Sequence, residues 1–136
     1  NTADDTGRPH PDFVAGFGQA DALGAVQTML DGRFQEGSVA QNQEQLTTLT
    51  VPPGTHRLKA TLVWTDPESD ANAAQALVND LDLTLEHPAS GQRWHPWVLS
   101  SFPHPDSLAL PARRRPDHLN NAEQITLDLP AAGTYR

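Results

Sequence analysis

The sequence predicts a mainly β fold: a jelly-roll-like antiparallel β-sandwich preceded by a short helix. The clearest support comes from residues 57–65, where Leu58, Ala60 and Leu62 recur on one face with the two-residue period of a strand. Turns are also frequent, because the 136 residues include 12 Pro and 9 Gly that divide the chain into short segments. Strands with one apolar face must cover it with another sheet, so we expect two sheets packed face to face.

One helix is expected near the N-terminus, over residues 19–30. Apolar side chains recur there at helical spacing, and Gly32 provides a stop. The apolar positions are Ala20, Leu23, Val26, Met29 and Leu30. The rest of the chain offers no evident partner for this face. The sequence therefore divides into an N-terminal segment, residues 1–32, and a β body, residues 33–136.

The β body is expected to contain six or more short strands. They cover residues 45–51, 57–65, 77–86, a return strand that begins at Gln92, residues 123–129 and residues 134–136. The expected inward-facing residues are Leu81, Leu83 and Leu85 in the third strand and Ile125, Leu127 and Leu129 in the fifth. Residues 101–119 have no period and are expected to form a long loop. The last strand is expected to be cut off at Arg136.

Charge and composition exclude several classes of function. Acidic residues outnumber basic ones by 17 to 9, which gives a net charge of −8 and argues against nucleic-acid binding. The chain has no Cys, which excludes disulfides, a thiolate zinc site and a cysteine nucleophile. No segment approaches the roughly 20 apolar residues of a membrane-spanning helix, and none has the pattern of a signal peptide. We therefore expect neither a nucleic-acid nor a membrane partner.

Several motifs give the chain a family resemblance. In the N-terminal segment these are Asn1-Thr2-Ala3, Pro11-Asp12-Phe13, Gly16-Phe17-Gly18-Gln19-Ala20-Asp21-Ala22 and Ala25-Val26. They resemble the end of the catalytic domain of subtilisin-like serine peptidases (subtilases), where a Gly-aromatic-Gly turn leads into a final helix that packs on that domain. This resemblance would explain why the apolar face of the helix has no partner within the chain.

The β body carries further motifs in the same order as the family. They are Thr61-Leu62-Val63-Trp64-Thr65-Asp66-Pro67, Ala76-Leu77-Val78-Asn79-Asp80-Leu81-Asp82-Leu83, Asn120-Asn121-Ala122-Glu123 and Pro130-Ala131-Ala132-Gly133-Thr134-Tyr135. They resemble the C-terminal β-sandwich of the large bacterial subtilisins. Two departures stand out: Ala122 replaces the usual Val, and residues 101–118 do not resemble the family's loop.

The resemblance implies a non-catalytic role for this chain. The family's catalytic Asp, His and Ser all lie upstream of the segment that Asn1-Thr2-Ala3 matches, so no catalytic residue is assigned here. The implied function is that of a domain that stabilises and flanks the catalytic domain of a secreted, extracellular bacterial serine endopeptidase. Its partners would be that catalytic domain in the same parent chain and the parent's protein or peptide substrates. The alternative is an adhesion, carbohydrate-binding or peptide-binding β-sandwich module.

Acidic residues near several strand ends suggest a structural calcium site. If those ends meet, the oxygens could form the six-to-eight-ligand cage that Ca²⁺ prefers, and the family's sandwich carries calcium. The candidate ligands are Asp66, Asp80, Asp82, Asp117, Asn120, Asn121 and Glu123. The alternative is a solvated polar face on which Asn and Asp form turns.

The remaining candidates favour ordinary structural roles. The six His residues are scattered without a zinc-binding pattern, so no zinc is expected. Trp64 is expected in the core, whereas Trp94, Trp97 and Phe102 would favour the binding-module alternative if they formed an exposed strip. The run 113–115, three consecutive Arg, is either a solvated loop, an anion contact or a processing site.

Overall fold

The computed structural model describes all 136 residues and is mainly β, with small antiparallel sheets and few helices. The elements are α1 (Ala22–Leu30), β1 (Leu49–Val51), β2 (Arg57–Val63), β3 (Leu85–His87), β4 (Gln92–Trp94), β5 (Trp97–Val98), α2 (Pro105–Leu108), β6 (Arg113–Arg114), β7 (Ala122–Asp128) and β8 (Gly133–Tyr135). Strand β1 pairs with β8, β2 with β7, β3 with β4 and β5 with β6. The predicted mainly β class is confirmed.

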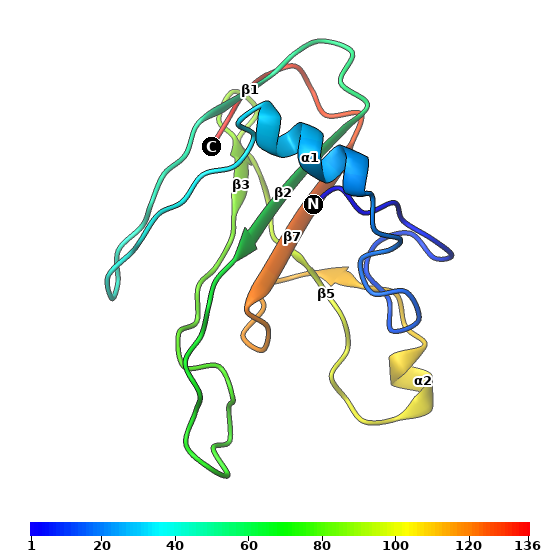
Figure 1. Ribbon diagram of the computed structural model, residues 1–136, viewed down its shortest axis with the longest axis vertical. Coiled ribbons are helices and arrows are strands. Elements are labelled where there is room, and N and C mark those ends of the chain that lie inside the picture. The colour runs from blue at the N-terminus through cyan, green and yellow to red at the C-terminus, as the bar shows by residue number, and fades with distance from the viewer.

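The longest pair, β2 with β7, runs side by side through the middle of the molecule (Figure 1). Its register is antiparallel from Arg57 opposite Asp128 to Val63 opposite Ala122. These are the two segments with the clearest apolar alternation, so the sequence prediction is confirmed here. The predicted hairpin at β3 and β4 is confirmed as well, with Leu85 opposite Trp94.

The buried core is built from strands of three different pairs. Its buried members are Val51, Leu85, Ile125, Leu127 and Tyr135. Leu49, Leu58, Leu83 and Trp94 pack against this cluster and are partly buried. Because β1, β3, β7 and β8 all contribute, the small sheets depend on one common apolar cluster for stability.

The predicted strand over residues 77–86 is wrong for most of its length, since β3 starts only at Leu85. The backbone donors that a strand would need are used by side chains instead. The N–H groups of Val78 and Asn79 donate to the carboxylate of Asp66, and the N–H of Leu83 donates to Glu123. Backbone groups bonded in this way cannot join a sheet ladder.

Residues 101–119 are more ordered than the predicted loop. They contain α2 and the two-residue strand β6, which pairs with β5. Strands this short have no period that a sequence could reveal.

Strand β1 is also shorter than predicted. Trp64, predicted in the core, follows β2 and is half-buried, outside the core cluster. Leu129, predicted to point inward, is exposed because the backbone turns there with a φ of 47°.

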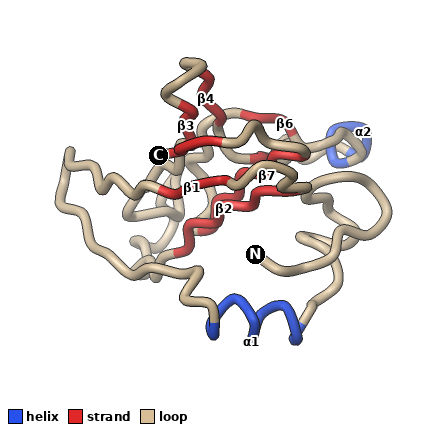
Figure 2. Tube along the Cα trace, turned by 90° about the horizontal axis from the view of Figure 1, so that it is seen from above, coloured by secondary structure: helices blue, strands red, loops and turns tan.

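Helix α1 ends at the predicted residue, Leu30, but begins at Ala22, three residues after the predicted start. The Asp21 side chain caps it by accepting a hydrogen bond from the N–H of Gly24 at 2.9 Å. Gly32 follows its C-cap with a φ of 62°, which favours glycine. No residue of the helix is buried, and Figure 2 shows α1 standing apart from the strands. Neither helix has the length and apolar character needed to cross a membrane.

The turn before α1 depends on a close backbone approach. Gly18 lies so near Asp4 that an added Cβ would sit 2.1 Å from the Asp4 carbonyl oxygen. Asp4 and Gln19 exchange two backbone hydrogen bonds across this contact, at 2.9 and 2.8 Å. Only glycine fits here, as the Gly-aromatic-Gly pattern suggests.

Candidate functional site

The most unusual side chain of the molecule is Glu123, near the start of β7. It is 1% exposed and shares the inward face of the strand with Ile125 and Leu127. One carboxyl oxygen, Oε2, accepts a hydrogen bond from the N–H of Leu83 at 2.5 Å. The other, Oε1, is buried and has no hydrogen-bond partner. A buried acceptor without a hydrogen-bond partner destabilises the folded state. A cation, a proton or a water molecule bound to Oε1 would remove this cost.

Burial and neighbouring charges change the ionisation of Glu123. Burial is the largest cause and raises its pKa to about 7, against a smaller lowering by the Leu83 hydrogen bond. The negative charges of Asp82, Asp117 and Asp80 raise the pKa further. These three carboxylates therefore lie close enough to Glu123 for their charges to act on it. An added cation would relieve both the burial cost and the mutual repulsion.

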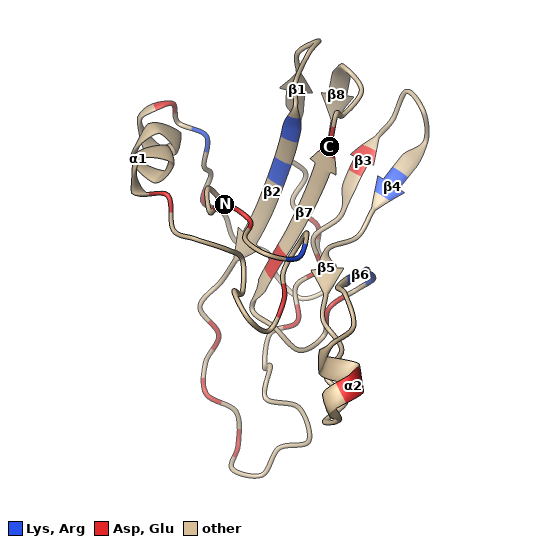
Figure 3. Cartoon of the chain, turned by 90° about the vertical axis from the view of Figure 1, so that its right-hand side faces the viewer, with Lys and Arg blue, Asp and Glu red and all other residues tan.

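The three neighbouring aspartates are held differently. Asp117 is buried, and its oxygens accept from the N–H of Leu119 at 3.0 Å and the side chain of Asn120 at 2.7 Å. Asp80 lies 2.8 Å from Nδ1 of His118. Asp82 is exposed and has neither an ion-pair partner nor a side-chain hydrogen bond. Acidic positions gather around the start of β7 and on the long loop beside it (Figure 3).

Two of the predicted calcium ligands are engaged elsewhere. Both oxygens of Asp66 accept hydrogen bonds from Val78 and Asn79, which organises the loop after β2. The Asn121 side chain donates to the carbonyl of Trp64 at 3.0 Å and closes the end of the β2–β7 pair. The other predicted ligands lie in the neighbourhood of Glu123: the charges of Asp80, Asp82 and Asp117 act on it, and Asn120 donates to Asp117. We call Asp80, Asp82, Asp117, Asn120 and Glu123 the acidic cluster. His118, which sequence reasoning left out, joins it through Asp80.

The acidic cluster has the chemistry of a calcium site but not its closed geometry. No group of three or more His, Cys, Asp or Glu side chains is placed to hold a metal ion. The oxygen donors are nonetheless the type that Ca²⁺ selects, and the unpaired Oε1 of Glu123 is a ready ligand. Coordination would require the side chains of the acidic cluster to come closer together than they are in this structure.

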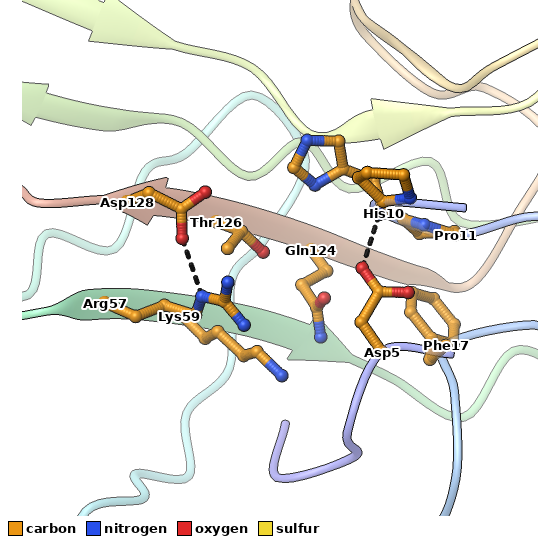
Figure 4. Close-up of a pocket in the computed structure, with 10 residues that line it drawn as sticks. Asp5, His10, Pro11, Phe17, Arg57, Lys59, Gln124, Thr126 and Asp128 are labelled. Atoms are coloured by element: carbon orange, nitrogen blue, oxygen red, sulfur yellow. Dashed lines mark hydrogen bonds and ion pairs between the residues drawn. The ribbon is translucent and has the colours of Figure 1, made fainter. Parts of the chain in front are cut away.

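A second site lies between the N-terminal segment and the β2–β7 sheet (Figure 4). This small cavity, of about 80 Å³, has a largely polar lining. At its ends Arg57 pairs with Asp128 at 2.7 Å, and the N–H of His10 donates to Asp5 at 2.6 Å. These contacts, together with the Lys59 ammonium on the carbonyl of Ala3 at 2.6 Å, fasten the N-terminal segment to the sheet.

The cavity does not contain a nucleophile activated by a base. Its only histidine is His10, whose pKa is lowered by burial and by the nearby Arg114. Elsewhere Ser90 Oγ lies 2.9 Å from Nδ1 of His87, but no carboxylate hydrogen-bonds to that histidine. A catalytic triad needs the third group to orient the base. The Ser90 contact therefore belongs to the turn of the β3–β4 hairpin.

The three aromatic residues of the binding-module alternative do not form an exposed strip. Trp94 packs on the core beside Tyr135, with ring centroids 6.1 Å apart. Trp97 is stacked on His10 at 3.8 Å, and the Arg114 guanidinium lies 4.1 Å from its ring centroid. Only Phe102 is exposed, at 66%. A carbohydrate-stacking surface needs open aromatic faces, which Trp94 and Trp97 do not offer.

Comparison with known proteins gives no family assignment. No protein-family model matches the chain, and no curated protein matches it.

Proposed function

We propose that this chain is the C-terminal part of a subtilisin-like serine endopeptidase. In this proposal residues 33–136 form a non-catalytic β-sandwich, and residues 1–32 form the end of the catalytic domain. The ordered motifs of the sequence support the proposal. The observation that carries it is the open apolar face of α1, which lies in the segment assigned to the catalytic domain.

The exposure of that face is large for a helix of a folded protein. Leu23 is 77% exposed and Met29 66%, and Val26 and Leu30 are exposed beside them. An amphipathic helix gains most of its stability by burying its apolar stripe. An exposed stripe of this kind marks a contact surface, and the missing catalytic body would supply the contact.

Several contacts favour a jelly-roll-like sandwich for the β body. Beyond the named pairs, Glu86 of β3 and Arg136 after β8 exchange two backbone hydrogen bonds, at 2.7 and 3.0 Å. This contact extends the β1–β8 pair toward β3 and β4. The β2–β7 pair supplies Ile125 and Leu127 to the same core. In the proposed sandwich, β1, β8, β3 and β4 would face the β2–β7 pair across this core.

The proposed role is to cover one side of the catalytic domain and to protect it from unfolding and autolysis. The parent would be a secreted bacterial enzyme that hydrolyses protein or peptide substrates through its own serine nucleophile. Calcium bound at the acidic cluster would be structural, stiffening the joint between β7 and the segment before β3. The surroundings of Glu123 support this part of the proposal.

The chain on its own should be catalytically inactive. We expect the purified 136-residue protein neither to cleave casein nor to react with a fluorophosphonate, because Ser90 lacks an orienting carboxylate and no other serine hydroxyl hydrogen-bonds to a histidine ring. Active subtilisin in the same assay provides the positive control. Casein cleavage that the fluorophosphonate abolishes would refute the proposal.

Charged substitutions on α1 should be harmless in the isolated chain. Leu23→Glu and Met29→Lys replace exposed side chains, so we expect each to change the free energy of unfolding by less than about 0.5 kcal/mol. Urea denaturation measures this change. In the parent enzyme the same substitutions should lower stability and secreted yield. Destabilisation of the isolated chain by more than about 2 kcal/mol would show that α1 already has a partner within it.

A further inference from the structure

We propose that the pocket beside β6 binds an organic carboxylate with a short apolar group, such as the C-terminus of a peptide. The pocket measures about 100 Å³ and is lined by Val98, Ser100, Leu110, Pro111, Arg113 and Arg115. This inference does not depend on the proteolytic role proposed above. It rests on how the three consecutive arginines divide between the two faces of their strand.

The arginine run alternates as a strand requires. Arg114 points to the inner side, where it lies over Trp97 and donates to the carbonyls of His95 and Thr126. Arg113 and Arg115, on either side of Arg114 in the sequence, both line the pocket. Val98 is the register partner of Arg113 and lines the pocket as well. Figure 3 shows the basic positions at β6.

The two outer guanidinium groups lack an acidic partner. Neither Arg113 nor Arg115 forms a salt bridge, although the chain has 17 acidic residues. Arg115 is steadied by one hydrogen bond from Nη2 to the carbonyl of Leu99 at 2.8 Å, which leaves its other donors free. A guanidinium presents paired N–H donors that match the two oxygens of a carboxylate.

The pocket also has groups that would select the rest of the ligand. Ser100 lines the pocket, and its Oγ, hydrogen-bonded to Ser107 Oγ, can form a further hydrogen bond. Val98 and Leu110 form the apolar part of the lining, against which an apolar group of the ligand could pack. The net charge of −8 repels anions at long range, so binding must come from these local contacts. A carboxylate with an apolar group can bond to the arginines and also pack against the apolar residues, whereas phosphate can bond only to the arginines.

Titration of the ¹⁵N-labelled 136-residue chain tests the site, with N-acetyl-leucine, N-acetyl-Ala-Ala-Leu and their C-terminal amides as probes. We expect both acids to shift the amide signals of residues around β5 and β6, and the amides to bind at least tenfold more weakly. Tighter binding of the tripeptide identifies a peptide C-terminus, and equal binding identifies a small free carboxylate. Both results support the site.

Substitutions test whether ligand affinity depends on Arg113 and Arg115 themselves or only on the net charge of the chain. Arg113→Gln and Arg115→Gln should each weaken N-acetyl-leucine binding by about tenfold, since each removes a charge-assisted hydrogen bond. The control Arg33→Gln removes the same charge after α1 and should leave affinity unchanged. Unchanged spectra confirm that each variant is folded. Equal binding of acid and amide, equal binding of inorganic phosphate, or no effect of either β6 variant would overturn the proposal.

Discussion

Millimolar Ca²⁺ should raise the melting temperature of the chain at pH 8, and Glu123→Gln should remove most of that rise. A ligand at one hundred times its dissociation constant stabilises a fold by about 2.7 kcal/mol, which corresponds to roughly 10 °C for a domain of this size. The effect is expected to be large because the ion would pair with the buried Oε1 of Glu123 and relieve the repulsion from Asp82 and Asp117. Differential scanning calorimetry with Ca²⁺ or EDTA measures it.

The raised pKa of Glu123 determines how stability, with and without calcium, should change with pH. The pKa of Glu123 rises from 4.5 to about 7 on folding, chiefly through burial. Between these values the folded chain holds a proton that the unfolded chain has released, so without calcium this group's contribution to stability falls as pH rises through that window. The loss amounts to about 3 kcal/mol by pH 8. Since Ca²⁺ competes with that proton, its stabilising effect should grow over the same window.

The matched control is Glu36→Gln, which removes an exposed carboxylate between α1 and β1. It should keep both the calcium response and the pH slope. Glu123→Gln should lose both and, without calcium, should be at least as stable as the original chain at pH 8, because a neutral amide replaces a buried charge. A calcium shift of equal size in Glu123→Gln would place the ion elsewhere. No shift in the original chain would reject calcium altogether.

Ile125→Ala should destabilise the chain by about 2–5 kcal/mol, the usual cost of truncating a large buried aliphatic side chain. Ile125 is 0% exposed and lies in the cluster that joins β1, β3, β7 and β8. Total stabilities of small domains are only about 5–15 kcal/mol, so the substitution should remove a large fraction. Urea denaturation at pH 6 should show a lower midpoint with an unchanged slope.

Val63→Ala provides the comparison within the same pair of strands. Val63 is 67% exposed at the end of β2, so its truncation should cost less than about 1 kcal/mol, mainly through lower β propensity. Similar costs at the two positions would show that Ile125 does not occupy the centre of a shared core.

The elements that sequence reasoning found are those that local physics determines. Helix α1 has its cap at Asp21 and its stop at Gly32, and both signals lie within a turn of the helix ends. In β2 and β7 the alternation is long enough to define a face. Residues 77–84 show the limit of this reasoning, because Leu81 and Leu83 alternate with Asp80 and Asp82 although the backbone donors are taken by Asp66 and Glu123. Only the tertiary structure reveals that competition.

The candidate site was predictable in part. The two-residue period that places Ile125 and Leu127 in the core also places Glu123 on the buried face, so the signal for its burial is present in the sequence. The separation of Asp66 and Asn121 from the acidic cluster was not predictable, because it depends on hydrogen bonds to Asn79 and Trp64 across the end of the sheet. The pocket beside β6 was not predictable, because a strand of two residues is too short to produce a recognisable period in the sequence.

The most direct test concerns the natural polypeptide that contains these 136 residues. An antibody to the chain would be used to isolate this polypeptide from its source. The polypeptide would then be labelled with a fluorophosphonate and digested, and mass spectrometry would identify the serine that carries the label. We expect a labelled serine on the same polypeptide, upstream of Asn1. A polypeptide that carries residues 1–136 and takes no label, or takes it on a serine within them, would contradict the view that this β body accompanies a separate proteolytic domain.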